Sequence, residues 1–260
     1  MATLTLRDAL LGGKRRPKRF GAGSPTTYRG DGYEFVELRA YVPGDDVRRI
    51  DWAATARAGE LQTRVVLEDV ALTLAALIDD SPSMHVGRTR TLVAAAEEAA
   101  TAWFGTARGG DRLLRIGSDH VGPPYIPVTT QFNVGTALET ARAALRRGTA
   151  LLTISDWYEL DDRHDDLLAN LGAWCDCTAM IARDPWYDGL PLGGIVRFAG
   201  AEGGTLRVYV GKRERAAFAA AVRAREDALT QRFARAGWRS GILTEANGAA
   251  SLRTAFGVPA

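Results

Sequence analysis

Cysteine, histidine and methionine are scarce in this sequence. Of its 260 residues, two are cysteines, three are histidines and three are methionines. Cys175 and Cys177 are two positions apart, so in a strand they point to the same face, a spacing poorly suited to a mutual disulfide. Two thiolates cannot complete a zinc site, and the histidines show no metal-ligand spacing. We therefore expect neither a disulfide framework nor a zinc site, and we expect both cysteines to be buried in a strand.

Long uncharged segments and a strong excess of charge are also absent. No uncharged run approaches the length of about 20 residues that crosses a bilayer, and Arg7 and Asp8 interrupt the apolar residues of the N-terminus, unlike a signal peptide. The net charge is only +2, which gives no general sign of nucleic-acid binding. We expect a cytoplasmic protein with no membrane span and without a nucleic-acid partner.

The N-terminal quarter of the chain divides into two parts. Residues 1–30 hold seven Lys or Arg against one acid, with glycines and prolines between them, which predicts a basic flexible arm. Nucleic-acid binding through the run KRRPKR is the alternative to a solvated tail. Residues 31–69 contain two alternating runs, EFVELRAYV and LQTRVVLE, which predict strands in an extension that packs on the core.

Apolar strand-like runs and helical patterns alternate over residues 70–260. The predicted strands are 70–78, 111–117, 149–157, 175–182 and 240–245, and the predicted helices are 89–107, 134–147, 163–172, 211–237 and 249–256. Such alternation predicts an α/β fold with a doubly wound, mostly parallel sheet of Rossmann type. Two β-like runs, GGIVRFAG and GTLRVYVG, predict a hairpin inserted at residues 185–211.

The central apolar run, Val70 to Ile78, ends in a polar turn. Asp79, Ser81 and Ser83 occupy alternate positions there, so their oxygen atoms converge on one side of an extended backbone. One carboxylate and two hydroxyls suit a hard cation such as Mg²⁺. The alternative is that Asp79 ends the strand and one serine caps the next helix, and the spacing alone leaves both open.

A second acid, Asp156, ends the later strand TALLTISDW. Since the carboxyl ends of parallel strands share one edge of the sheet, we expect Asp79 and Asp156 to meet there although they are far apart in the sequence.

The segments EFVELRAYVPGDDVRRIDWAATAR and LIDDSPSM resemble the signature of the domain-of-unknown-function 58 family. These are bacterial and archaeal proteins with a von Willebrand factor A-like domain. The resemblance runs from about residue 32 to residue 84 and continues more loosely to the C-terminus through SDW and ARDPWYDGLP. It implies a metal-ion-dependent adhesion site built from a D-x-S-x-S turn, a threonine before a later helix and an aspartate after a later strand.

The resemblance assigns site residues one by one. The turn corresponds to Asp79, Ser81 and Ser83, the later aspartate to Asp156, and the threonine to Thr136 in VGTALETA. The sequence departs from the family pattern at Val134, where a glycine is more usual, and at Pro82, which stiffens the turn. Thr130 and Asn133 are the alternatives for the middle ligand.

The resemblance implies a binding module rather than an enzyme. A bound Mg²⁺ or Mn²⁺ would accept an exposed Asp or Glu of a partner protein. Members of the family often occur beside MoxR-type AAA+ ATPases, which implies an adaptor or co-chaperone for such an ATPase. No G-x-S-x-G elbow, phosphate loop or H-E-x-x-H helix is present. The competing hypothesis is a Mg²⁺-dependent phosphatase with Asp79 as nucleophile, although such enzymes need an aspartate where this chain has Ser81.

Overall fold

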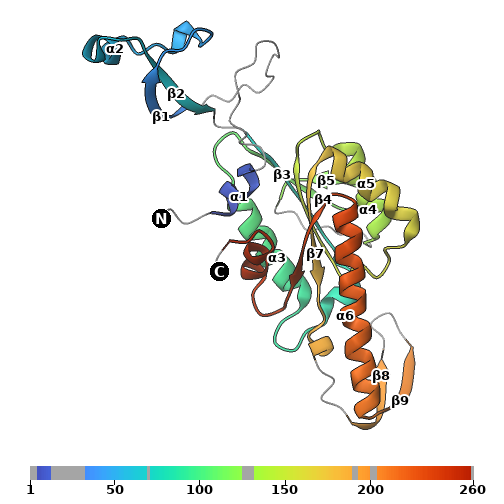
Figure 1. The fold of residues 1–260 in the computed structure, drawn as a ribbon. Coiled ribbons are helices and arrows are strands. Elements are labelled where there is room, and N and C mark those ends of the chain that lie inside the picture. The colour runs from blue at the N-terminus through green and yellow to red at the C-terminus, as the bar shows by residue number, and fades with distance from the viewer. Residues whose placement is uncertain are drawn as a thin grey trace.

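A central sheet of six strands organises the protein, in the order β10-β7-β6-β3-β4-β5 (Figure 1). The computed structural model describes residues 5–12, 33–68, 71–124, 132–188, 193–199 and 204–258. The strands of this sheet are β3 (Thr73–Ile78), β4 (Arg112–Ile116), β5 (Val121–Gly122), β6 (Ala150–Ser155), β7 (Asp176–Ala182) and β10 (Arg239–Leu243). All neighbours are parallel except β4 and β5. The predicted doubly wound, mostly parallel α/β fold is confirmed.

Helices cover both faces of the sheet, which explains why β3 reads as an uninterrupted apolar run. Leu74, Ala76 and Ile78 belong to the core under α3 (Leu92–Phe104) and α7 (Gly248–Ala255). The alternate residues Ala75 and Leu77 belong to the core on the other face. That second core lies under α4 (Val134–Ala144), α5 (Asp165–Trp174) and α6 (Lys212–Arg235). A strand buried on both faces has no place for charge until it ends.

One glycine sets the distance between the two helices on the first face. A Cβ atom at Gly248 would lie 1.9 Å from the carbonyl oxygen of Ala95 in α3. Only glycine therefore allows the first turn of α7 to approach α3 so closely.

Cys175 and Cys177 are both free and buried, as expected. Cys177 lies in β7, as predicted, whereas Cys175 is the C-cap of α5 and not part of a strand. The hydrogen bond with Cys175 is the largest cause that raises the pKa of the Cys177 thiol, and burial adds to the shift.

A short helix, α1 (Leu6–Gly12), packs against the core. Leu6 and Leu10 are buried, and Arg7 forms an ion pair with Asp111 at 2.5 Å and donates to the carbonyl oxygen of Thr106. The prediction of a flexible arm over residues 1–30 did not foresee this helix, because its partner Asp111 is distant in the sequence. Residues 13–30 of that arm, including KRRPKR, lie outside the described residues.

Two further sheets, each of two antiparallel strands, lie at opposite ends of the molecule (Figure 1). The first joins β1 (Tyr33–Ala40) to β2 (Gln62–Glu68), with α2 (Trp52–Ala58), which the sequence did not predict, between them. The second is the predicted hairpin of β8 (Gly194–Ala199) and β9 (Thr205–Val210). Short 3₁₀ turns occur at Val47–Arg49, Pro82–His85, Asp162–His164 and Pro185–Asp188. None of the helices in the described part of the chain is long and apolar enough to cross a bilayer.

Candidate metal centre

The carboxylate of Asp79 is held between two neighbouring strands at the carboxyl edge of the sheet. Its backbone N–H donates to the carbonyl oxygen of Ile154 at 2.9 Å, which continues the pairing of β3 with β6. Its Oδ2 accepts a hydrogen bond from Ser155 Oγ at 2.6 Å, and its Oδ1 accepts one from the backbone N–H of Ser81 at 2.8 Å. Asp79 is only 3% exposed. Its side chain is therefore fixed before any ligand binds.

Ser81 and Ser83 turn their hydroxyl groups toward each other, with the two Oγ atoms 2.9 Å apart. Ser81 precedes the 3₁₀ turn Pro82–His85, but its side chain makes no capping hydrogen bond. The capping alternative therefore does not describe what Ser81 does here. Pro82 occupies the first position of the turn, where its fixed φ angle is compatible with the backbone. The structure thus brings Ser81 beside the carboxylate of Asp79 and the hydroxyl of Ser83 beside that of Ser81.

Asp156 follows β6 and lies at the same edge as Asp79, with 8% of its surface exposed. Its Oδ1 accepts a hydrogen bond from the backbone N–H of Tyr158 at 3.0 Å, and its carbonyl oxygen accepts one from Arg225 Nη2 at 2.7 Å. The next residue, Trp157, has a left-handed backbone (φ 60°) although it is not glycine. Such a conformation costs on the order of 1–3 kcal/mol and is concentrated at functional sites.

Packing holds Trp157 in this conformation. Its indole N–H donates to the carbonyl oxygen of Met180 at 3.1 Å, and its ring packs edge-on against Phe233, with the ring centres 4.8 Å apart. The buried indole therefore fixes the chain reversal that leaves Asp156 at the edge of the sheet.

Burial raises the pKa of Asp79 above its usual value. Hydrogen bonds from Ser155 and Ser81 oppose this shift, and the negative charge of Asp156 adds to it. Across the described residues, no basic side chain forms an ion pair with Asp79. A buried carboxylate near a second carboxylate and without a basic partner is the setting that a cation would stabilise.

Thr136 lies in the first turn of α4, and its side chain is exposed. Its Oγ1 donates to Asn133 Oδ1 at 3.0 Å, and Asn133 is the N-cap of the helix. The start of α4 is tied to the loop after β6, because the N–H of Val134 donates to Glu159 Oε2 at 3.1 Å. No contact between described residues joins Thr136 to Asp79 or Asp156. The role of Thr136 as the middle ligand stays a prediction. Of the two alternatives, Asn133 uses its Oδ1 to accept the capping hydrogen bond from the N–H of Thr136, and Thr130 lies outside the described residues.

Ser155 and Glu159 belong to this edge of the sheet but were missed in the sequence. Ser155 is 1% exposed and fixes Asp79, and its Oγ also accepts a hydrogen bond from the N–H of Trp157 at 2.9 Å. A hydroxyl at the last position of a buried strand, directly before Asp156, was the available signal.

The donor set fits a hard cation that retains some of its water. The described residues contain no group of three or more His, Cys, Asp or Glu side chains that could hold a metal ion. Any cation at Asp79 would therefore need oxygen atoms of Ser81 and Ser83 as well as carboxylates, a mixture that suits Mg²⁺ or Mn²⁺ better than zinc.

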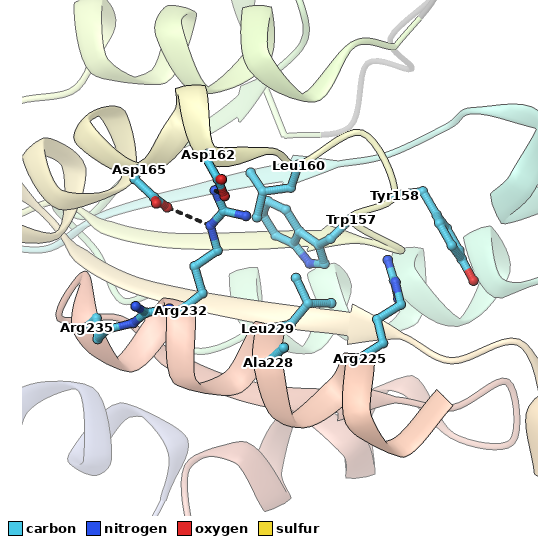
Figure 2. A pocket seen from close by; sticks show the side chains of 10 residues that line it. All are labelled: Trp157, Tyr158, Leu160, Asp162, Asp165, Arg225, Ala228, Leu229, Arg232 and Arg235. Atoms are coloured by element: carbon cyan, nitrogen blue, oxygen red, sulfur yellow. Dashed lines mark hydrogen bonds and ion pairs between the residues drawn. The ribbon is translucent and has the colours of Figure 1, made fainter. Parts of the chain in front are cut away.

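A pocket of about 540 Å³ lies beside this edge, between the loop after β6 and helix α6. Figure 2 shows Arg225 and Tyr158 at one end, Arg232 near Asp162 and Asp165 at the other, and apolar side chains between them. None of the predicted metal ligands lines the pocket. Arg225 connects the two regions, because it stacks on the ring of Tyr158 at 3.8 Å and also holds the carbonyl oxygen of Asp156.

Comparisons of the sequence confirm part of the resemblance. Residues 37–131 match the family described as "Protein of unknown function DUF58". Proteins of Mycobacterium tuberculosis and Mycobacterium bovis, described only as uncharacterized, are 31% identical over 206 residues, covering 69% of this chain and 64% of each relative. The chain thus spans less than two thirds of the length of these relatives.

Two solved structures are similar to this chain at a lower sequence identity than the mycobacterial relatives. An aerotolerance-related membrane protein of Bacteroides fragilis, with multiple mutations to serines, is 12% identical with a TM-score of 0.45, covering 72% of this chain and 98% of that chain. The conserved hypothetical protein BatB of Bacteroides thetaiotaomicron is 12% identical with a TM-score of 0.41, covering 72% and 96%. The family model itself matches residues 37–131, a segment that contains Asp79, Ser81 and Ser83.

Proposed function

We propose that the carboxyl edge of the sheet binds a divalent cation and through it an acidic side chain of a partner protein. The observation that carries the proposal is the buried carboxylate of Asp79, which has hydrogen-bond donors but no basic partner among the described residues. A bound Mg²⁺ or Mn²⁺ would supply a coordination position for a carboxylate from outside. Asp79, Ser81, Ser83 and Asp156 would hold the ion, with Thr136 as the fifth candidate.

The protein's own residues would prepare this binding. Ser155 and the N–H of Ser81 fix both oxygens of Asp79, so little side-chain freedom is lost when a ligand arrives. The hydroxyls of Ser81 and Ser83 add oxygen donors without adding charge, which leaves the ion able to attract a further carboxylate. The edge would thus recognise a protruding Asp or Glu.

The wider role follows from the family resemblance. The resemblance supports a role as an adaptor or co-chaperone of a MoxR-type AAA+ ATPase. In this proposal the protein acts in the cytoplasm and has no enzymatic activity of its own. No observation of the described residues favours a phosphatase or a nucleic-acid-binding protein.

Calorimetric titration of Mg²⁺ and Mn²⁺ into the wild type, Asp79→Asn and Asp80→Asn tests the site. Asp80 is the matched control because it is the next residue, its side chain is 44% exposed, and its ion-pair partner among the described residues is His85. We expect the wild type and Asp80→Asn to bind the ion alike and Asp79→Asn to lose binding. Equal affinity of all three proteins would contradict the site.

The partner hypothesis needs a second measurement. Association with a candidate MoxR-type ATPase should be seen with Mg²⁺ and disappear in chelator. Association that persists undiminished in chelator would overturn recognition through a bound ion.

A further inference from the structure

The hairpin of β8 and β9 has one face on which apolar and basic side chains alternate. Ile195 pairs with Tyr209 across the two strands, and Arg197 pairs with Arg207. Directly opposed residues and residues two apart in a strand point to the same face. The four side chains therefore form one surface, which we call the hairpin face.

The hairpin face is open to solvent. Ile195 is 82% exposed and Tyr209 is 65% exposed, and both arginines are exposed. The opposite face of the ribbon is covered only toward the start of α6, where Val210 is 3% exposed and Val196 and Val208 are partly buried, whereas Leu206 on that face is 62% exposed. Figure 1 shows the hairpin at the end of the molecule where α6 begins.

The two arginines are placed against each other at some cost in stability. Like charges directly opposite in an antiparallel pair repel each other and destabilise the pairing. Across the described residues, neither Arg197 nor Arg207 has a hydrogen bond or an ion pair to relieve this repulsion. An acidic group lying between the two guanidinium groups would convert the repulsion into attraction.

We propose that the hairpin face binds an extended, acidic segment of a partner protein. In an extended chain, side chains two positions apart lie on the same side and repeat at about 6.6–6.8 Å, the same spacing as along β8. A segment with an apolar residue and, two positions later, an Asp or Glu would cover Ile195 and Tyr209 with the first and neutralise Arg197 and Arg207 with the second. Each strand of the ribbon pairs with one other strand, which leaves it a second edge for main-chain hydrogen bonds with such a segment.

The alternation favours a protein segment over other acidic partners. A nucleic-acid backbone would contact the arginines but would leave the exposed Ile195 without an apolar partner. An anionic membrane would bind best to large apolar residues between the two strands, whereas the sequence there, GAEGG at residues 200–204, has an acid and no large apolar residue. Apolar and acidic side chains at a spacing of two positions are a property of polypeptides.

This face is separate from the candidate metal centre. None of its four residues is a predicted metal ligand, and the proposal needs no bound ion. Its test can therefore succeed or fail independently of the proposed function.

The test measures binding of a fluorescent peptide that repeats leucine, serine, glutamate and serine, by anisotropy, in chelator. We expect the wild type to bind it and Arg197→Glu to bind at least about tenfold more weakly, equivalent to about 1.4 kcal/mol. The same substitution puts a carboxylate opposite Arg207 in place of a like charge, so the thermal midpoint should stay the same or rise. Arg223→Glu is the control, since it makes the same change of charge at an exposed position of α6.

Several outcomes would overturn the proposal. They are no peptide binding by the wild type, equal loss in Arg197→Glu and Arg223→Glu, and equal binding of a peptide with lysine in place of glutamate. Binding of single-stranded DNA or phosphatidylserine vesicles without binding of the peptide would assign the face to that partner instead. Self-association of the wild type that Arg197→Glu abolishes, seen by sedimentation, would show that a second copy covers the face. Retained peptide binding with selective loss in Arg197→Glu supports the proposal.

Discussion

Asp79 and Asp111 are two carboxylates with buried side chains at opposite ends of neighbouring strands of one sheet, and their surroundings differ. Asp79 follows β3 and Asp111 precedes β4, its parallel neighbour. Asp111 has an arginine partner, Arg7, and also accepts hydrogen bonds from the backbone N–H groups of Leu72 and Arg108. Among the described residues, Asp79 accepts hydrogen bonds from serine and backbone groups and from no basic side chain, and its neighbour Asp156 is also acidic.

The difference appears in the two pKa values. Burial acts to raise the pKa of Asp111, but the hydrogen bond from Arg7 and those from the backbone outweigh it, and the pKa lies below its usual value. At Asp79 burial prevails, and the pKa is raised. One carboxylate is neutralised by the chain itself and has a structural role. The negative charge of Asp79 is not neutralised by a basic side chain among the described residues. A buried carboxylate of this kind is expected at a binding site.

Loss of the structural pair should have the largest effect. Arg7→Ala leaves Asp111 buried without a cation, and we expect the free energy of unfolding to fall by about 3–5 kcal/mol. Urea denaturation measures this loss, with Arg223→Ala, an exposed arginine on α6, as a control that should change little. A loss below about 1 kcal/mol would mean that α1 does not contribute a buried ion pair.

Addition of Mg²⁺ should reverse which protein is more stable, the wild type or Asp79→Asn. In chelator at neutral pH, Asp79→Asn removes an unfavourable buried charge and should unfold at a higher temperature than the wild type. At 100 times the dissociation constant, Mg²⁺ should stabilise the wild type by about 2.7 kcal/mol and leave Asp79→Asn unchanged. Thermal unfolding with and without Mg²⁺ measures both effects. Equal stabilisation of the two proteins would remove Asp79 from the site.

Much of the fold could be predicted because parallel strands buried on both faces leave long apolar runs, as in β3 and β6. Helix α1 could not, because the burial of Arg7 depends on Asp111, which lies 104 positions away. From the local sequence, Arg7 is predicted to belong to a solvated tail, because the basic run KRRPKR follows it closely.

The candidate site was predictable to the extent that its residues are close in sequence or fixed by topology. Asp79, Ser81 and Ser83 share one turn, and Asp156 follows from the rule that parallel strands end at one edge. Ser155 was missed because a hydroxyl in a buried strand can bond to its own backbone or across the sheet, and only the register of β3 with β6 decides. The position of Thr136 depends on how the first turn of α4 is placed relative to β3 and β6, which local patterns do not determine.

The pH dependence of stability should have opposite signs at the two carboxylates. The lowered pKa of Asp111 means that its contribution is present above the usual aspartate value of 3.8 and is lost as the pH falls through the folded-state pKa. The raised pKa of Asp79 means that stability falls as the pH rises from 3.8 through its folded-state pKa. In metal-free buffer, the advantage of Asp79→Asn should therefore grow on raising the pH, and the deficit of Asp111→Asn should shrink on acidification. Urea titrations across this range that give parallel curves for the three proteins would contradict both assignments.

The smallest expected effect concerns the hydroxyl that orients Asp79. Ser155→Ala removes the 2.6 Å hydrogen bond to Asp79 Oδ2 and leaves all predicted ligands in place. Groups that orient a metal ligand typically change affinity by about 10–100-fold, and we expect the lower end because the N–H of Ser81 still holds the other oxygen. Calorimetry should give a dissociation constant for Mg²⁺ about tenfold higher, whereas Thr153→Ala, a buried hydroxyl in the same strand that bonds to the carbonyl oxygen of Thr178, should leave it unchanged. If both substitutions weaken Mg²⁺ binding alike, the effect comes from the strand as a whole, and Asp79 is not positioned by Ser155.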